Sequence, residues 1–457
     1  MATSPTLEHV GESTAVQLAA HTLERRAIEA AIWGMPLVAF DAMRQAFFRD
    51  AGASYGDIVY LSKPADWKFQ VTTPNASARY VYIQINTKDG PQVLDIPPAV
   101  GAGLFGSMND AWQAPQADVG PAGQDGGKGG KYLLLPPNYT LAVPQGYFPV
   151  RFNTYNGYCI LRAIPASNSA ADVSRALDLV RKIRFYRLAQ VTSPREQRYV
   201  DIAGKLFDCI VHFDESFYDS LARMIDEEPV QTRDLIAMAH ARTLGVEKGG
   251  GKPFKPPNAT AEILERAVGE AHAGFSHAIT VGQRYWPGSG WYTPGTSLGP
   301  TTGFTYELAD RLDVDERAMA FYLGCAPPRK LGAATFYLWA ARDASGEPLQ
   351  GGNTYRLRVP PNVPAKQFWA ATVYDVDTAA FFHNAPTIEV NSYGQGLAKN
   401  PDGSVDVHFG PVAPNVADAN WVYTAPGKSW ISAFRFYGPG NRVFDKTWVL
   451  PDIEKSG

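Results

Sequence analysis

Two positions in the sequence combine an ionisable side chain with an apolar setting, as acid–base chemistry requires. Asp110 stands two positions before Trp112, and a carboxyl group beside a large apolar ring can have a raised pKa. His383 lies within residues 381–384, which read Phe-Phe-His-Asn, and apolar neighbours favour a neutral imidazole that can accept a proton. Each residue also has a structural interpretation, Asp110 as a turn carboxylate and His383 as a hydrogen-bonded core histidine.

Arg435 and Tyr437 share one face of a predicted strand near the C-terminus. Every second residue of a strand points the same way, so the two side chains would project together. Either could bind an anion or polarise a carbonyl group, although Arg435 could instead form an ion pair with Asp445. The catalytic candidates fall in different predicted domains, which leaves their convergence open; they are Asp110, His383, Arg435 and Tyr437.

A glycine-rich stretch at 119–131 carries two lysines, Lys128 and Lys131. A phosphate-binding Walker A loop needs Gly, four residues and then Gly-Lys-Ser/Thr, and neither lysine has that context. No strand–helix–strand unit surrounds the stretch, so a dinucleotide site is not predicted. Two interpretations stay open: a backbone nest that holds an anion, and a long loop that packs on another subunit.

Trp286 and Trp291 frame a Pro-Gly-Ser-Gly turn. Aromatic walls suit sugars, aromatic compounds and apolar ligands, and the alternative is a plug between domains or subunits. The predicted ligand-binding residues are Trp112, Lys128, Lys131, Trp286 and Trp291.

Motifs for metal and nucleophile chemistry are missing from the sequence. The eight histidines form no HExxH or HxH motif, and there is no GxSxG elbow. Cys159, Cys209 and Cys325 form no CxxC pair, which favours three buried thiols over a disulfide scaffold. We therefore predict no metal and no cofactor.

Charge and composition narrow the class of protein. The chain of 457 residues carries 42 Lys and Arg against 45 Asp and Glu, and this balance gives no general attraction to nucleic acid or an anionic membrane. The first 24 residues contain no Lys or Arg, so the basic segment of a secretory signal is missing. The longest near-apolar run, residues 30–40, is too short to span a bilayer. We expect a cytoplasmic protein that binds a small molecule.

The spacing of apolar residues divides the chain into helical and strand regions. Three- and four-residue spacing predicts helices over 14–49, kinked or ended at Pro36, and again over 169–285 and 304–325. Period-two alternation predicts strands over 53–165 and beyond 325, with Asp89-Gly90 as a hairpin turn. Ser169 and Asp172 have the spacing of a helix N-terminal cap.

These regions predict a β-rich α+β fold, with antiparallel β-sandwich or jelly-roll-like domains at both ends and a helical domain between them. No repeat of 20–50 residues is apparent. Sparse charge and many aromatic residues favour a homo-oligomer. The predicted parts are N-terminal helices at 1–52, a β domain at 53–168, a helical domain at 169–303 and a C-terminal β-sandwich domain at 304–457.

Three segments of the sequence resemble a known pair of domains. They read DGPQVLDIPP at 89–98, FGSMNDAWQAPQADVGPAGQDGGKGGKYLLLPPN at 105–138 and KSWISAFRFYGPGNRVFDKTWVLPDIE at 428–454. With their surroundings they are similar to the paired domains of unknown function numbered twelve-fifty-four (N-terminal half) and twelve-fourteen (C-terminal half). The resemblance implies β-sandwich-like domains at both ends, a helical domain between them and assembly into dimers or tetramers, and it implies no settled activity.

Two segments depart from the pattern of this family. The family usually has Asn, an acidic residue and Thr before the Tyr of its first strand, where residues 74–80 of this chain read PNASARY. The family often has Thr-Arg after the Tyr-Asp of a C-terminal strand, where this chain has Thr378-Ala379. If those polar residues line a site in the relatives, the site is modified here.

The sequence favours a cofactor-independent enzyme that hydrolyses or isomerises a small organic molecule by carboxylate and histidine acid–base chemistry. A small-molecule or carbohydrate-binding protein without catalysis is one alternative. A structural assembly protein is another.

Overall fold

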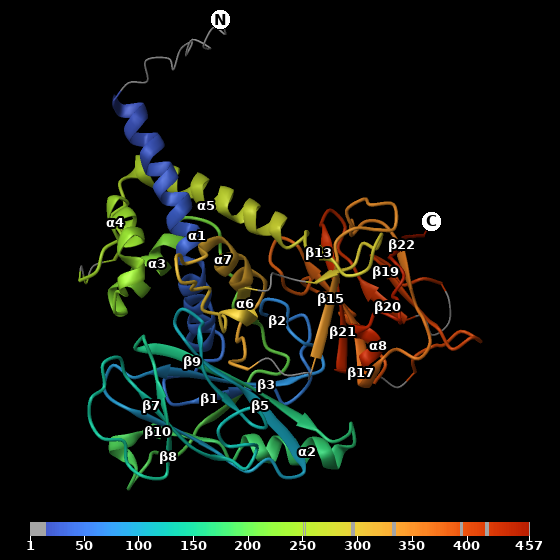
Figure 1. Ribbon diagram of the computed structural model, residues 1–457, viewed down its shortest axis with the longest axis horizontal. Helices are drawn as coiled ribbons and strands as arrows, with labels where there is room; N and C mark the ends of the chain where they lie inside the picture. Colours follow the sequence, from blue (N-terminus) through green and yellow to red (C-terminus); the bar gives the residue numbers. More distant parts are fainter. Residues whose placement is uncertain are drawn as a thin grey trace, which may run out of the picture.

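The computed structural model describes residues 15–249, 251, 253–293, 298–330, 335–393, 396–415 and 420–456. It is a β-rich α+β structure in which two β domains flank a helical region, as predicted (Figure 1). The long helix α1 (Ala15–Arg49) runs through the helical region down to the N-terminal β domain. The other helices of this region are α3 (Ser216–Glu227), α4 (Leu235–Thr243), α5 (Asn258–Ala278), α6 (Leu298–Thr301) and α7 (Val314–Leu323).

The N-terminal β domain packs a six-stranded sheet against a four-stranded sheet. The six-stranded sheet has the order β11 (Tyr199–Asp201), β1 (Ile58–Tyr60), β3 (Arg79–Asn86), β9 (Asn156–Pro165), β5 (Ala102–Asp110) and β6 (Pro115–Val119). The four-stranded sheet has the order β10 (Arg184–Arg187), β4 (Gln92–Ile96), β7 (Gly130–Leu135) and β8 (Tyr147–Arg151). Helix α2 (Ala170–Val180) packs on the same core, and Ser169 caps it as predicted.

The C-terminal β domain also pairs a six-stranded with a four-stranded sheet. The larger sheet has the order β13 (Gln283–Arg284), β14 (Tyr292–Thr293), β15 (Thr335–Ala340), β21 (Trp430–Pro439), β17 (Ala365–Asp375) and β18 (Glu389–Asn391). The smaller sheet has the order β20 (Asn420–Tyr423), β19 (Val405–Gly410), β16 (Tyr355–Val359) and β22 (Glu454–Lys455). The short helix α8 (Asn441–Phe444) follows β21.

The two β domains share one topology. The chain order β3 to β9, α2, β10 in the first corresponds to β15 to β21, α8, β22 in the second. Strand neighbours and directions correspond as well: β9 lies between β3 and β5, and β21 lies between β15 and β17, all antiparallel. Even the parallel pair β7–β8 has its counterpart in β19–β20. The same fold therefore occurs twice in the chain, although no short sequence repeat is visible.

Alternation along the strands gives each six-stranded sheet two different faces. One face forms the sandwich core, with residues such as Val81 and Leu161 in the first domain and Leu338 and Phe434 in the second. The opposite face of each sheet, called the outer face below, packs against the helices. The two outer faces thus share a third hydrophobic core with α1, α3, α5 and α7.

The predicted possibility that the helix ends at Pro36 is wrong, because α1 continues through this residue. A proline removes one helical hydrogen bond and crowds the preceding turn. Here the helix around Pro36 is buried on all sides, and its carbonyl accepts a hydrogen bond of 3.0 Å from the Gln113 amide. Tertiary packing therefore outweighs the local preference.

Two other local predictions differ from the structure. The predicted helical region 169–285 also contains β10, β11 and β12 (Phe207–Asp208), which pair with β4, β1 and β2 (Phe69–Gln70), and its end contains β13 of the C-terminal sheet. Asp89-Gly90 does form a turn, with Gly90 at φ 117°, but the flanking strands β3 and β4 lie in different sheets and form no hairpin. In both places, pairing with strands that are distant in the sequence determines the secondary structure and the sheet to which each strand belongs.

Candidate functional site

A cavity of about 430 Å³ lies between the outer faces of the two six-stranded sheets. That volume is within the range of small-molecule sites. Helix α7 and the segments at 299–306 and 324–328 complete its wall, and Glu316 of α7 is an acidic residue of the lining. The strand residues that line it include Tyr80 and Tyr82 of β3, Ile160 and Arg162 of β9, Tyr337 and Trp339 of β15, and Arg435 of β21.

The shared topology places a tyrosine and an arginine at the same register position on both sides of this cavity. Tyr80 is the cross-strand partner of Arg162, and Tyr337 is the cross-strand partner of Arg435. Each guanidinium lies over the ring of its own tyrosine, with 5.4 Å from Arg162 to the Tyr80 centroid and 5.3 Å from Arg435 to the Tyr337 centroid. Cation–π contacts of this kind hold a guanidinium in place without cancelling its charge.

Arg162 lies deep in the protein and keeps part of its surface open to the cavity. Burial lowers the pKa of its guanidinium, but the nearby hydroxyls of Tyr80 and Tyr337 outweigh that effect and raise the pKa overall. Within the described residues, no carboxylate lies within ion-pair distance of Arg162. Among the described residues, the side chain is therefore a positive charge in a largely apolar cavity with no carboxylate at ion-pair distance.

Arg435 is more completely engaged by the protein. Its Nη1 donates to Thr372 Oγ1 at 2.8 Å, and its Nη2 donates to the Thr73 carbonyl at 3.2 Å. Thr372 donates in turn to the Glu389 carboxylate at 2.9 Å, so the Thr372 hydroxyl bridges the guanidinium and this carboxylate. Burial lowers the pKa of Arg435, and the surrounding tyrosines and Glu389 raise it overall. The predicted alternative, an ion pair with Asp445, is wrong, since Asp445 is exposed and accepts from Thr447 instead.

Hydrogen bonds hold the segment 72–77 of the N-terminal domain against the outer face of the C-terminal domain. The Tyr374 hydroxyl donates to the Pro74 carbonyl at 2.6 Å, Asn75 Nδ2 donates to the Tyr437 hydroxyl, and Ser77 donates to Glu389 at 2.8 Å. Residues 72–75 also line the cavity. Arg435 and Tyr437, predicted as catalytic, thus lie together and hold this segment in place.

A backbone hydrogen bond joins the start of the segment 72–77 to the turn after β17. The Thr73 amide donates to the Ala379 carbonyl at 2.6 Å, and both residues have positive φ angles, 41° and 54°. Backbone strain at residues other than glycine costs about 1–3 kcal/mol and concentrates at functional sites. Thr73, Pro74 and Asn75 therefore form part of one wall of the cavity.

Apart from Glu316, most of the remaining wall is apolar and aromatic, with Phe69, Tyr82, Phe207, Phe321 and Trp339 among its side chains. Cys209 and Cys325 also line it. Burial raises the pKa of the Cys325 thiol to about 11 and raises that of Cys209 well above its ordinary value. Both thiols stay protonated at neutral pH, so neither is an activated nucleophile.

Asp110 and His383 lie outside the cavity lining and apart from each other. Asp110 ends β5 in a fully buried position, where it accepts hydrogen bonds from the Ala114 amide at 3.0 Å and Gln116 at 3.1 Å. Burial raises the pKa of its carboxyl group to about 7, as its apolar setting suggested. His383 is exposed, with its ring 5.7 Å from that of Trp67, so the predicted buried setting is wrong. The turn after Phe382 carries its side chain outward.

The predicted ligand-binding residues are also distributed over separate places. Trp112 packs on Trp33 with ring centroids 5.2 Å apart and lies 4.7 Å beneath the Arg317 guanidinium. Lys128 and Lys131 are exposed at the glycine-rich loop, where the buried Asp125 carboxylate accepts from the Gly120 amide and the Tyr132 hydroxyl, each at 2.8 Å. Trp286 and Trp291 are buried in the core of the C-terminal domain. None of the five tryptophan and lysine candidates lines the cavity.

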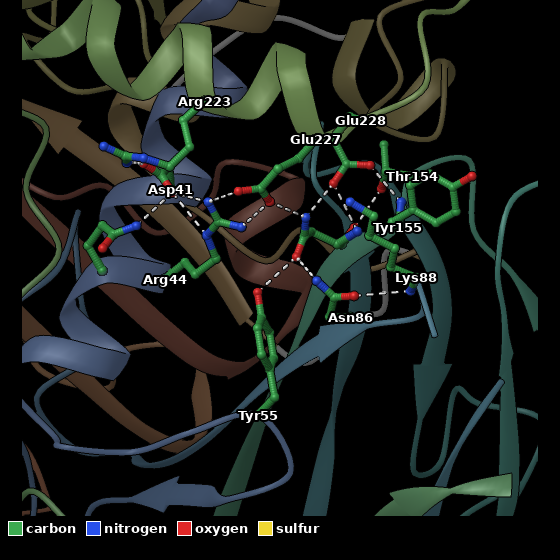
Figure 2. Close-up of polar contacts among 12 residues, drawn as sticks. Asp41, Arg44, Tyr55, Asn86, Lys88, Thr154, Tyr155, Arg223, Glu227 and Glu228 are labelled. Atoms are coloured by element: carbon green, nitrogen blue, oxygen red, sulfur yellow. Dashed lines mark hydrogen bonds and ion pairs between the residues drawn. The ribbon is translucent and has the colours of Figure 1, made fainter. Parts of the chain in front are cut away.

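A second polar cluster joins α1, α3 and the N-terminal domain (Figure 2). Arg44 binds Asp41 at 2.7 Å and Glu227 at 2.5 Å, and Asp41 also binds Arg223. Glu228 accepts from the amides of residues 155 and 156 at 2.6 and 2.9 Å. Every charged group in this cluster lies beside an opposite charge or a hydrogen-bond donor. We therefore interpret the cluster as a structural link between the helices and the N-terminal domain. Within the described residues, no group of three His, Cys, Asp or Glu side chains has the arrangement of a metal site.

Two family models match the chain, and both are described as proteins of unknown function. DUF1254 matches residues 56–187, and DUF1214 matches residues 334–441. The chain carries both domains. The DUF1254 match spans β1 to β10 and the DUF1214 match spans β15 to β21, so the two families correspond to the two β domains that share one topology.

One solved structure with a TM-score above 0.5 has the same fold. The VPA0106 protein from Vibrio parahaemolyticus is 17% identical with a TM-score of 0.55, and the alignment covers 95% of this chain and 100% of that chain. An uncharacterized protein from Burkholderia cenocepacia is 12% identical with a TM-score of 0.41, covering 96% of this chain and 94% of that chain. No curated protein matches the sequence. Over the described residues, no helix has the length and apolar character needed to cross a membrane.

The residues that sequence reasoning missed are Arg162 and its tyrosine partners. A signal for them exists in hindsight. Strand β9 of the DUF1254 domain reads NGYCILRAIP and β21 of the DUF1214 domain reads WISAFRFYGP. Each holds a single charged residue, an arginine, in an otherwise uncharged strand, and a lone charge inside a buried strand needs a partner.

Proposed function

We propose that the chain binds a small organic molecule with an apolar body and an anionic group, and that Arg162 anchors the anionic group. The observation that carries this proposal is the guanidinium of Arg162, which faces a cavity of about 430 Å³ with no carboxylate within ion-pair distance among the described residues. Burying a charge without a partner is costly, and a carboxylate ligand would remove that cost through a bidentate ion pair.

The shape of the wall supports the same ligand class. Phe69, Tyr82 and Trp339 offer apolar surface to the body of the ligand, and Tyr80 and Tyr337 offer hydroxyls beside the guanidinium. A few polar groups that converge within an aromatic pocket are typical of sites for small organic molecules. The proposal uses neither Asp110 nor His383, because neither lines the cavity.

Matched pairs of acids and neutral amides test this proposal. Hexanoate, benzoate and 3-phenylpropionate would each be compared with the corresponding primary amide, by thermal shift and by isothermal titration calorimetry. We expect at least one acid to bind and its amide to bind at least about 10-fold more weakly, because the amide forms no ion pair with Arg162. Mass spectrometry of the recovered ligand then shows whether it is returned unchanged or converted.

Arg162→Gln tests the anchor, with Arg356→Gln as its matched control. Arg356 is an exposed arginine of β16 that pairs with Glu454 on the surface. We expect Arg162→Gln to weaken binding of the acid by about 10- to 100-fold, the range for loss of a charged hydrogen bond. Equal affinity of acid and amide, or an Arg162→Gln protein that binds like Arg356→Gln, would contradict the proposal.

A further inference from the structure

We infer that the ligand carries two separate anionic groups, one bound by Arg162 of the DUF1254 domain and the other by Arg435 of the DUF1214 domain. This inference rests on the proposed function and narrows its ligand to a small organic dicarboxylate. It comes from the shared topology, which builds the same tyrosine–arginine pair twice and turns both pairs toward one cavity.

The two arginines belong to a single site. Both line the same cavity, and Tyr337, whose ring lies 5.3 Å from the Arg435 guanidinium, lines it with them. Within the described part of the chain, neither guanidinium has a carboxylate within ion-pair distance. Two such cations around one apolar cavity match a ligand with an acidic group at each end.

The acidic residues beside the two tyrosine–arginine pairs are held by other partners, and neither forms a direct ion pair with an arginine of the pair among the described residues. Glu389 stands opposite Thr372 on β18, and Asp118 stands opposite Ser107 at the equivalent place on β6. Asp118 accepts from the backbone amides of Arg329 and Lys330 at 2.7 and 2.8 Å, which holds the segment leading to β15. Among the described residues, neither a hydrogen bond nor an ion pair joins Asp118 to Arg162.

Glu389 acts on Arg435 only through the Thr372 hydroxyl. Since Arg435 also donates to the Thr73 carbonyl, its remaining donors are fewer than those of Arg162. We therefore expect the second anionic group to strengthen binding by less than the first. The Arg162 end is the primary anchor, and the Arg435 end distinguishes a dicarboxylate from a monocarboxylate.

The test compares each dicarboxylate with its own monoamide on the wild-type protein. The probes are succinate, glutarate, adipate, pimelate and terephthalate, each with its monoamide, measured by isothermal titration calorimetry. We expect the best-fitting dicarboxylate to bind about 10-fold more tightly than its monoamide. Equal affinities across the whole series overturn the inference while leaving the proposed function intact, whereas an absence of binding by every acid overturns both.

Two variants assign the ends of the ligand. Arg435→Gln should bring the dicarboxylate-to-monoamide affinity ratio close to one, while Arg162→Gln should weaken both members of each pair. If Arg435→Gln fails to fold, the wild-type comparison still decides the inference. A ratio that Arg435→Gln leaves unchanged in a folded protein would overturn the assignment of the second group to Arg435.

Discussion

The two β domains have the same strand order and the same tyrosine–arginine pair, yet they treat the arginine differently. In the DUF1214 domain, Arg435 is 4% exposed and donates to Thr372 and to the Thr73 carbonyl. In the DUF1254 domain, Arg162 has a cation–π contact with Tyr80 and remains open to the cavity. A shared backbone thus fixes where a charged side chain lies, and the neighbouring residues decide how many of its hydrogen-bond donors stay available to a ligand.

The strand ends that dock on the helices show a second contrast between the domains. Asp110 ends β5 and Asp375 ends β17, and their cross-strand partners are equivalent positions of β9 and β21. Burial raises the pKa of both carboxyl groups, but Lys428 lies 3.4 Å from Asp375 and lowers its pKa in part. Asp110 has no basic group at ion-pair distance among the described residues, and the Arg233 charge reaches it only from farther away. A basic side chain therefore offsets the charge of Asp375 in the C-terminal domain. The equivalent Asp110 of the N-terminal domain has no such neighbour among the described residues, so burial raises its pKa further.

The two β domains also differ in how they are attached to the helices. This difference gives the largest predicted change in the free energy of unfolding. The N-terminal domain is joined to α1 and α3 through the ion cluster around Arg44 (Figure 2). We expect Arg44→Ala to lower the free energy of unfolding by about 3–5 kcal/mol, because Asp41 and Glu227 lose their shared cation. Urea unfolding measures the change, with Arg356→Ala as a surface control expected to cost below about 1 kcal/mol. Similar losses in the two variants would show that this attachment is not ionic.

The contrast between the arginines predicts stability effects of opposite sign without ligand. Arg162→Met should raise the free energy of unfolding by about 1 kcal/mol, since it removes a charge that lies deep in the protein with no carboxylate at ion-pair distance among the described residues. Arg435→Met should lower it by about 2–3 kcal/mol, since it removes two hydrogen bonds and leaves the Thr73 carbonyl without its donor. Chemical unfolding of both variants and the wild type gives the signs. Destabilisation by both would mean that the two arginines have the same role.

The two buried aspartates predict a difference in pH dependence. The folded protein keeps a proton on Asp110 up to about pH 7, whereas the unfolded chain loses it near pH 4. Between these values the unfolded state binds fewer protons, so the contribution of Asp110 to stability falls as pH rises and levels off above about pH 7. Asp110→Asn should remove this fall.

The measurement is the free energy of unfolding from pH 4 to pH 8 for the wild type, Asp110→Asn and Asp375→Asn. We expect the advantage of Asp110→Asn over the wild type to grow with pH. Asp375→Asn should show a smaller gain, because Lys428 already offsets the charge of that carboxylate. A pH-independent difference for Asp110→Asn would contradict the raised pKa of Asp110.

The smallest predicted effect concerns the attachment of the C-terminal domain to the helices, which relies on neutral hydrogen bonds. The Tyr322 hydroxyl of α7 donates to the Val376 carbonyl at 2.8 Å, beside a contact of 2.7 Å between His272 of α5 and the Asp377 carbonyl. Tyr322→Phe keeps the buried ring and removes the hydroxyl, so we expect a loss of about 1 kcal/mol. A loss as large as that of Arg44→Ala would remove the distinction between ionic and neutral attachment.

The β-rich ends, the helical region between them, the helix cap at Ser169 and the paired families could all be predicted from the sequence, because periodicity, caps and motifs are local signals. The sequence also indicated correctly that the apolar setting of Asp110 raises its pKa. Tertiary structure decided the rest. Burial kept α1 continuous through Pro36, and pairing with distant strands turned part of a predicted helical region into β10 and β11.

The residues of the candidate site come together only through tertiary contacts. Arg162 and Arg435 are 273 positions apart, and no local pattern shows that their strands are equivalent members of two sheets that face one cavity. The exposure of His383 also depends on the tertiary structure. The same holds for the hydrogen bond from Arg435 to Thr372, because the two residues lie on different strands. A sequence records which side chains are charged, and the fold decides which of those charges lacks a partner.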